Sequence, residues 1–298
     1  MYNLVLLIVC FLAGVLLRWS GRMPEGGASV LNSFIITISL PAITLLHIHE
    51  LRLGGEMLFM VAMPWLHFGL AVVFFLLLSR MFGFSRSVTG VLILCAGLGN
   101  TSFVGLPMIE AFYGREALVH GIVVDQLGSF LVLSIAGISV AGIYSGGGPS
   151  VQDIARSIVT FPPFIAMVIA LGLLPFEYPL WLTAVLQRLG DTLAPIALVS
   201  VGFQLHTGRG GLDRRALFSG LLFKLVLAPF MLMLLYRGMF GLEGVAVEVT
   251  LFEAAMPPMI TAGIVAEQYG LEPGLANMLV AGGILLSFVT LPLWVMML

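Results

Sequence analysis

Stretches of about twenty apolar residues recur along the whole chain, separated by short segments that carry charges, glycine or proline. A helix needs about 20 such residues to cross the roughly 30 Å hydrocarbon core of a bilayer. Only 9% of the 298 residues are charged, whereas a soluble domain carries about 25%. The sequence therefore predicts an all-α integral membrane protein with ten transmembrane helices. The predicted spans cover residues 2–18, 29–49, 57–79, 89–112, 117–144, 154–174, 180–206, 215–237, 245–267 and 274–296.

Arginines are distributed unevenly between the two sides of the predicted membrane. One side carries Arg18, Arg22, Arg80, Arg86, Arg156, Arg209, Arg214 and Arg215, and the other carries Arg52, Arg115, Arg188 and Arg237. Because cytoplasmic loops retain basic residues, the richer side is predicted to be cytoplasmic. Both termini are then expected on the periplasmic side of a bacterial inner membrane. The basic residues form no run, so no nucleic-acid partner is expected.

A flexible segment, Ser-Gly-Gly-Gly-Pro-Ser at 145–150, lies near the middle of the chain. We predict a cytoplasmic linker at residues 145–153. It separates a first five-helix unit, residues 1–144, from a second, residues 154–298.

Three short patterns recur in the same order in the two halves. Met-Phe-Gly occurs at 81–83 and 239–241, Tyr-Gly-x-Glu at 113–116 and 269–272, and a proline at 41 and 195. A duplicated unit with an odd number of helices enters the membrane from opposite sides, so the halves are predicted to be inverted repeats. This architecture is typical of alternating-access transporters. Chance similarity of apolar segments is the alternative.

The fourth and ninth predicted spans contain residues that interrupt a helix. Residues 97–107 of the fourth span hold three glycines, a proline and three polar side chains, and the ninth span contains Met256-Pro257-Pro258. Paired interruptions in inverted halves indicate a binding site near the membrane midplane. The N-termini of half-helices suit an anion such as a carboxylate. Simple proline kinks are the alternative.

Ionisable side chains inside the bilayer are costly, and each is therefore a functional candidate. Glu253 lies one turn before Pro257 and is the predicted site of proton or cation coupling. Asp125 and Gln126 are further coupling candidates, although they also suit a role in bonding an interrupted helix. Asn32 is a candidate for substrate binding or for helix capping.

Two other polar residues lie within apolar spans. Lys224 is predicted to extend toward the cytoplasm, with pairing to an acid as the alternative. His67 is interpreted as a buried imidazole with a hydrogen-bond partner rather than as a proton relay.

The sequence lacks the nucleophile elbow, P-loop, paired cysteines and His-Glu-x-x-His of common enzymes and pumps. We therefore expect no enzyme activity and no cofactor, with transport driven by an ion gradient. A secondary transporter of a small organic anion is the favoured interpretation. A transporter-like membrane sensor and a passive channel are the alternatives.

Several motifs together resemble the auxin efflux carrier family, whose bacterial members include malonate and organic-acid permeases. The resemblance covers nearly the whole chain. It rests on residues 32–48 with Leu40-Pro41, Gly99-Asn-Thr-Ser-Phe-Val-Gly-Leu-Pro107, Tyr113-Gly114, Asp125-Gln126 and Ala254-Ala-Met-Pro-Pro258.

The resemblance implies a fold similar to that of bile-acid/sodium symporters, with a scaffold domain, a transport domain and a crossing of the fourth and ninth helices. Substrate would lie beside that crossing. The resemblance places Asn100, Thr101, Pro107, Met256 and Pro257 around the substrate. Ser102 and Asn32 are further candidates for substrate binding.

Glu253 stands roughly where the sodium symporters carry an acidic ion ligand, so sodium coupling is the alternative to proton coupling. The ninth span lacks an asparagine near its prolines, unlike the plant carriers. A mono- or dicarboxylate is therefore expected rather than auxin itself. Carriers of this fold type are often dimers through the scaffold, which makes a homodimer a further expectation.

Overall fold

A computed structural model describes residues 2–24, 26–48, 55–146, 159–204 and 213–298, together with Gln152 and Arg156. Most of the predicted linker at 145–153 lies outside the described residues, as do Arg52 and Arg209, which entered the prediction of orientation.

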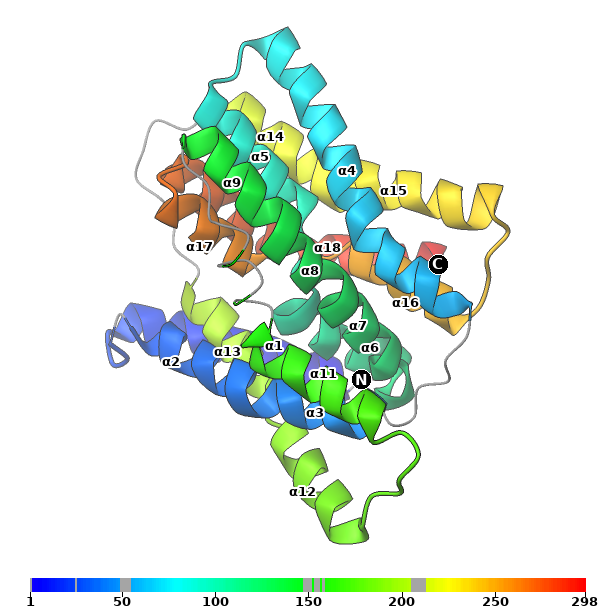
Figure 1. Ribbon diagram of the computed structural model, residues 1–298. Helices are drawn as coiled ribbons and strands as arrows, with labels where there is room; N and C mark the ends of the chain where they lie inside the picture. The colour runs from blue at the N-terminus through cyan, green and yellow to red at the C-terminus, as the bar shows by residue number, and fades with distance from the viewer. Residues whose placement is uncertain are drawn as a thin grey trace. The chain divides into compact units, whose positions relative to one another are not determined.

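All regular structure in the described residues is helical (Figure 1). The first half of the chain forms α1 (Tyr2–Ser20), α2 (Gly27–Phe34), η1 (Ile35–Ser39), α3 (Leu40–Ile48), α4 (Glu56–Phe82), α5 (Arg86–Gly97), η2 (Thr101–Gly105), α6 (Leu106–Tyr113), η3 (Arg115–Ala117), α7 (Leu118–Val123), η4 (Val124–Ser129), α8 (Phe130–Val132), η5 (Leu133–Gly137) and α9 (Ile138–Ser145). The second half forms α11 (Pro162–Gly172), α12 (Leu180–Gly190), α13 (Leu193–Gln204), α14 (Arg214–Leu222), η6 (Phe223–Leu227), α15 (Ala228–Met233), η7 (Leu234–Met239), α16 (Val245–Ala254), α17 (Ile260–Gln268) and α18 (Pro273–Met297). Segment η3 is a 3₁₀ turn, and the other η segments are π-helical.

Six helical runs in the described residues are long and apolar enough to cross a membrane. They are Gly27–Ile48, Met57–Phe82, Arg115–Ser145, Leu180–Gln204, Arg214–Met239 and Pro273–Met297. They coincide with six of the ten predicted spans. The first and sixth spans correspond to shorter apolar helices, and the fourth and ninth are each divided between two helices. The count of ten spans stays a prediction.

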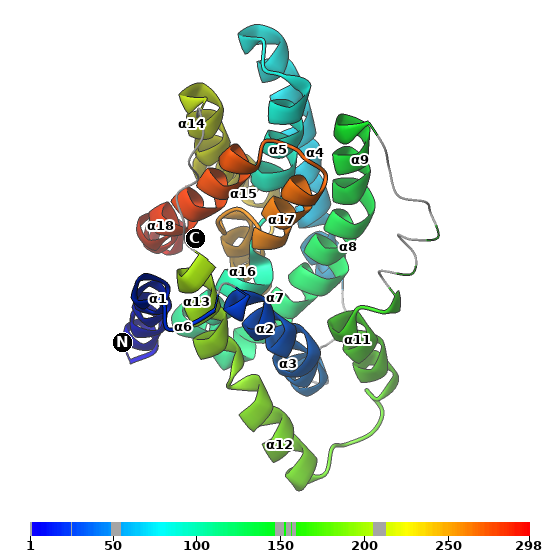
Figure 2. The same cartoon turned by 90° about the vertical axis from the view of Figure 1, so that its left-hand side faces the viewer.

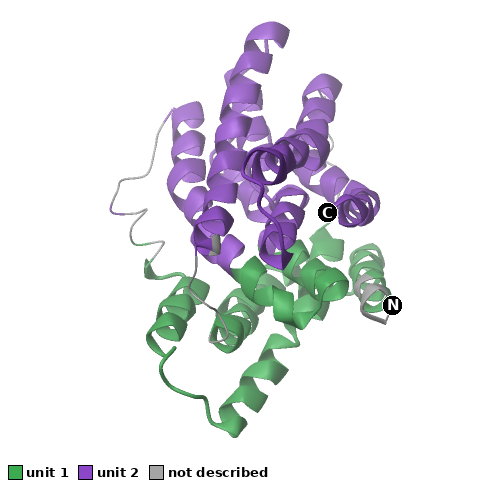
Figure 3. Ribbon diagram, turned by 90° about the vertical axis from the view of Figure 1, so that its right-hand side faces the viewer, with its two compact units in different colours: residues 1–54, 102–122, 156–205 green, residues 55–101, 123–155, 206–298 purple. Residues whose placement is uncertain are grey.

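The chain divides into two compact units, and each half of the sequence contributes to both of them (Figure 3). Unit 1 comprises residues 1–54, 102–122 and 156–205, and unit 2 comprises residues 55–101, 123–155 and 206–298. The predicted boundary at 145–153 is therefore a division of the sequence and does not separate the compact units.

In unit 1, α1 packs along α13, and α3 packs against α11 and α12 (Figure 2). Two glycines bring the backbones of α1 and α13 close together. A Cβ atom on Gly14 would lie 2.1 Å from the Val199 carbonyl oxygen, and one on Gly202 would lie 2.1 Å from the Phe11 carbonyl oxygen. Such small residues are typical of tightly packed membrane helices.

Unit 2 has its hydrophobic core around α5, which packs against α4, α9, α17 and α18. The core-facing residues from Val91 to Ala96 are almost completely inaccessible to solvent. Because α5 is enclosed on so many sides, the chain segment that follows it at Gly97 is held in the interior of unit 2. This placement determines where the functional site forms.

The glycines of the recurring sequence patterns share a positive φ. Gly83 and Gly241 end the Met-Phe-Gly patterns with φ of 69° and 62°, and Gly114 and Gly270 of the Tyr-Gly patterns have φ of 85° and 67°. Glycine suits these positions because it lacks the Cβ that disfavours positive φ.

Candidate functional site

The two helix interruptions predicted from glycine and proline are confirmed, and they meet inside unit 2. Helix α5 ends at Gly97, and Leu98 then takes an extended conformation with φ −118° and ψ 130°. Helix α16 ends at Ala254, and α17 begins at Ile260. Gly99 and Pro258 form an antiparallel bridge between the two interruptions.

Backbone hydrogen bonds join the interrupted segments. The Asn100 N–H donates to the Pro257 carbonyl at 2.8 Å, and the Met259 N–H donates to the Leu98 carbonyl at 3.0 Å. Polar backbone groups at membrane depth need partners inside the protein. Each interruption therefore supplies part of the hydrogen bonding that the other has lost. We call residues 98–100 together with residues 255–259 the crossing.

Helix α4 and segment η4 lie next to each other beside the crossing. Pro64 of α4 packs against Gly128 of η4, where an added Cβ atom would lie 2.6 Å from the proline Cγ. This close contact positions the side chains of Asp125 and Ser129 on η4 relative to Met63 and His67 on α4. All of these residues belong to unit 2.

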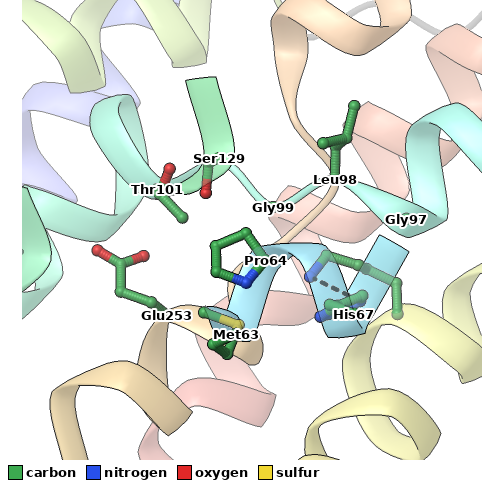
Figure 4. A pocket seen from close by; sticks show the side chains of 10 residues that line it. Met63, Pro64, His67, Gly97, Leu98, Gly99, Thr101, Ser129 and Glu253 are labelled. Carbon is green, nitrogen blue, oxygen red and sulfur yellow. Dashed lines mark hydrogen bonds between the residues drawn. The ribbon is translucent and has the colours of Figure 1, made fainter. Parts of the chain in front are cut away.

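A small cavity lies beside the crossing (Figure 4). The space open to the centre of a water molecule is about 10 Å³, which is about the room that one water needs. The cavity can therefore hold a water molecule or a bare monovalent ion, but no organic anion. Its walls are formed by Met63, Pro64, His67, Gly97, Leu98, Gly99, Thr101, Ser129, Lys224 and Glu253.

Glu253 contributes a carboxylate to this cavity, as its predicted position one turn before Pro257 suggested. The residue is 1% exposed. Neither carboxylate oxygen has a hydrogen-bond partner among the described residues. Its charged neighbours there are Asp125, of like sign, and Lys224, of opposite sign. A buried carboxylate without a donor is strongly destabilising when ionised, so this position favours the uptake of a proton or a cation.

The position of Lys224 contradicts the prediction that its side chain extends toward the cytoplasm. The residue is 0% exposed. Its ammonium donates to the Ala254 carbonyl at 2.9 Å and lies 3.5 Å from Nε2 of His67, the contact drawn as a dashed line in Figure 4. The prediction was wrong because the side chain finds a hydrogen-bond acceptor in the interior of unit 2. The C-terminal carbonyls of an interrupted helix are good acceptors for a cation.

His67 matches its interpretation as a buried imidazole with a partner. It forms a backbone hydrogen bond with Ala96, in addition to its contact with the Lys224 ammonium. The imidazole therefore links α4 to both α5 and η6.

Asp125 is buried and accepts a hydrogen bond from the Thr101 hydroxyl at 2.6 Å. Gln126 follows it on η4 and is also buried. The bond supports the interpretation that this acidic residue holds an interrupted helix, because Thr101 begins the helical segment after the crossing. It also brings Asp125 into the same cluster as Glu253 and Lys224.

The remaining predicted substrate residues fall in different units. Asn100, Met256 and Pro257 are part of the crossing in unit 2, whereas Ser102 and Pro107 belong to unit 1. Asn32 also belongs to unit 1, where its side-chain oxygen accepts a hydrogen bond from Ser200 at 2.6 Å.

Several site residues lie on π-helical segments. Thr101 is on η2, Asp125 and Ser129 are on η4, and Lys224 is on η6. Single π turns occur frequently at functional sites because they reorient side chains within a helix. No sequence pattern pointed to these turns. Sequence reasoning also missed the contributions of Ser129 and Met63. For Lys224 it gave pairing inside the protein only as the alternative, although a lysine within an apolar span was a usable signal.

The sequence model of the family described as membrane transport protein matches residues 1–143 and 150–295. The chain belongs to this family. It is the auxin efflux carrier family that the motifs resembled. Together with the apolar helices, membership identifies a multi-pass membrane transport protein.

Two curated members of the membrane transport protein family are similar over nearly their full lengths. An uncharacterized transporter from Methanothermobacter thermautotrophicus is 26% identical over 292 residues, which cover 96% of this chain and 94% of the relative. An uncharacterized transporter from Methanocaldococcus jannaschii is 24% identical over 280 residues, covering 90% and 89%. Both relatives are named as transporters, and neither name specifies a substrate.

Proposed function

We propose that this protein is a secondary transporter that moves a small organic anion, a mono- or dicarboxylate, by alternating access with proton coupling. The observation that carries the proposal is the buried carboxylate of Glu253, which has no hydrogen-bond partner among the described residues and lies beside two interrupted helices. Alternating-access transporters use interrupted helices to bind substrate and coupling ion away from the membrane surfaces. Family membership supports transport in general.

An anionic substrate is supported by the start of α17. Met259 precedes this helix, and no side chain caps it among the residues that the structure describes. The first N–H groups of a helix attract anions. Asn100, Met256 and Pro257, all in unit 2, are proposed to contribute to substrate binding. Ser102, Pro107 and Asn32 belong to unit 1 and stay substrate candidates on the sequence alone.

Proton coupling is supported by the charges of the buried cluster. Asp125, Glu253 and Lys224 would together carry one net negative charge if all three were ionised, and His67 is neutral without an added proton. An unbalanced charge inside a membrane protein is unfavourable. One proton, taken up in one half of the transport cycle and released in the other, would balance the cluster. Glu253 is the proposed carrier of that proton.

Sodium coupling is the second candidate. The cavity is small enough for a bare ion, and it offers the Glu253 carboxylate and the hydroxyls of Thr101 and Ser129 as oxygen ligands. Oxygen ligands of this kind suit hard cations.

A transporter-like sensor is the remaining alternative, and it would bind the anion without moving it across the membrane.

The proposed architecture is that of two inverted five-helix repeats. The matching positive φ angles of Gly83 with Gly241 and of Gly114 with Gly270 support it. An inner-membrane location with both termini on the periplasmic side is part of the same proposal.

The test is transport by the full-length protein reconstituted in proteoliposomes. Radiolabelled malonate and a panel of other mono- and dicarboxylates are supplied in sodium-free buffer, with and without a pH gradient. We expect saturable uptake that the gradient drives uphill. Glu253→Gln removes the exchangeable proton while preserving the size of the side chain, so uphill accumulation should fall to the level of passive leak.

Glu267→Gln is the matched control because Glu267 is exposed on α17 of the same unit. It should behave like the wild type. If Glu253→Gln retains the dependence on the pH gradient, Glu253 is not the coupling residue. Ligand binding without flux for every carboxylate would favour the sensor, and uptake without saturation or counterflow would favour a channel.

A further inference from the structure

The buried ammonium of Lys224 occupies a position suited to a small cation. It donates to the Ala254 carbonyl, the last residue of α16, at 2.9 Å. It also lies against the backbone of the crossing, because a Cβ atom on Gly99 would lie only 3.3 Å from Nζ. Carbonyl groups at the C-terminal ends of interrupted helices are the ligands that transporters use for bound cations.

The charged groups around the ammonium are also those expected around a bound cation. Glu253 acts on Lys224 with opposite charge. The titratable groups of the cluster are His67 from α4, Asp125 from η4, Lys224 from η6 and Glu253 from α16. A sodium ion placed in the same cavity would lie next to the ammonium and be repelled by it.

We propose that the ammonium of Lys224 is a tethered monovalent cation that takes the place of a bound sodium ion at the crossing. The inference rests on the proposed function, in which Glu253 is the coupling residue, and it selects protons over sodium. Lys224 balances one of the two carboxylates, and the remaining cavity has room for little more than one water. A proton is the small cation that can balance the other carboxylate without further space.

The inference can be tested by measuring sodium binding to the purified full-length protein through its apparent Tm. Unfolding is followed in sodium chloride and in choline chloride at equal concentration, without any organic anion. The wild type should unfold at the same temperature in both salts. Lys224→Ala removes the ammonium and opens space beside Glu253, so sodium chloride should raise its apparent Tm by several degrees.

Two further variants test whether the sodium response needs the vacated space and the Glu253 carboxylate. Lys224→Met removes the charge but fills most of the space, so it should show no response to sodium. The double variant Lys224→Ala with Glu253→Gln lacks the carboxylate and should lose the response of Lys224→Ala.

Sodium-specific stabilisation of the wild type would overturn the inference, and so would a folded Lys224→Ala protein that does not respond to sodium. If Lys224→Ala fails to fold, Lys224→Gln replaces it, since the neutral amide ends one atom earlier than the lysine side chain and offers an oxygen ligand. Even if both variants fail to fold, the wild-type comparison can still overturn the inference. Because no flux is measured, failure to find a transported carboxylate leaves these results unchanged. Sodium binding by the wild type would leave organic-anion transport intact.

Discussion

The two compact units bury polar groups in different ways. In unit 1 several buried or half-buried neutral side chains are bonded to one another. Ser200 donates to Asn32 and accepts from Gln204 at 3.0 Å, and Ser39 lies 2.7 Å from Thr192. In unit 2 the buried polar side chains include the charged groups Asp125, Lys224 and Glu253, and the Glu253 carboxylate has no hydrogen-bond partner among the described residues. Satisfied groups fix one arrangement, whereas an unsatisfied acid can exchange a proton or an ion.

The glycines of the two units also differ in what lies next to them. Gly14 and Gly202 of unit 1 allow two helix backbones to touch, whereas Gly99 of unit 2 leaves space that an ammonium occupies. The neighbour in unit 1 is a rigid carbonyl, and the neighbour in unit 2 is the end of a flexible side chain. We therefore expect substitutions in unit 1 to act mainly on stability and substitutions around the crossing to act on coupling as well.

The largest loss of stability is expected from Gly202→Ala. The added methyl group would lie 2.1 Å from the Phe11 carbonyl oxygen, so α1 and α13 would have to separate. Overpacking of this kind costs about 3 kcal/mol or more when the backbone has to move. The apparent Tm and the monodispersity of the purified protein should both fall.

Gly172→Ala is the control within the same unit. Gly172 ends α11, and a Cβ atom there has no neighbour within 4 Å among the described residues. Its stability should stay close to that of the wild type. Equal behaviour of the two variants would show that the close contact of α1 and α13 does not matter for stability.

Much of the fold could be predicted from the sequence because few backbone structures can cross a bilayer. Apolar runs and their glycine or proline ends predicted the helices, as at Gly83, and the residues between Gly97 and Pro107 predicted the first interruption. These signals are local. Each one depends on a few residues whose backbone preferences are strong.

The arrangement of the site depends on contacts between distant residues, and these were not predictable. Thr101 and Asp125 are 24 residues apart, and Lys224 finds its acceptor at Ala254, 30 residues away. The choice between extending to the surface and bonding inside depends on which helices surround the lysine. Likewise, short recurring patterns predicted two repeated halves, but nothing in those patterns indicated that each compact unit draws on both halves.

An intermediate effect is expected from Thr101→Val, which removes the donor to Asp125 while preserving shape. A hydrogen bond to a charged group contributes about 1.5–3 kcal/mol, so stability should fall by about 2 kcal/mol in denaturant or thermal unfolding. The variant should also change proton coupling, because Asp125 would lose the Thr101 donor while it lies close enough to Glu253 to repel its charge. Uptake in proteoliposomes at several pH values measures this change.

Thr250→Val provides a matched comparison in unit 2. Thr250 is equally buried, but its hydroxyl donates to the Ala246 carbonyl within the same helix at 2.6 Å. That carbonyl already serves the helix, so the loss should be under about 1 kcal/mol, with coupling unchanged. If both variants shifted the pH dependence of uptake equally, the bond to Asp125 would have no special role.

The smallest effect is expected from Asn32→Ala in unit 1, and it separates a packing role from substrate binding. The substitution removes the acceptor of the Ser200 hydroxyl, a neutral hydrogen bond worth about 1 kcal/mol. Ser200 also lies 3.5 Å from the Ala28 carbonyl, which limits the loss. A packing role predicts a small decrease in apparent Tm with an unchanged KM for the transported anion. A clear increase in KM at nearly unchanged Tm would instead assign Asn32 to the substrate, and the contrast between a structural unit 1 and a functional unit 2 would then fail at this residue.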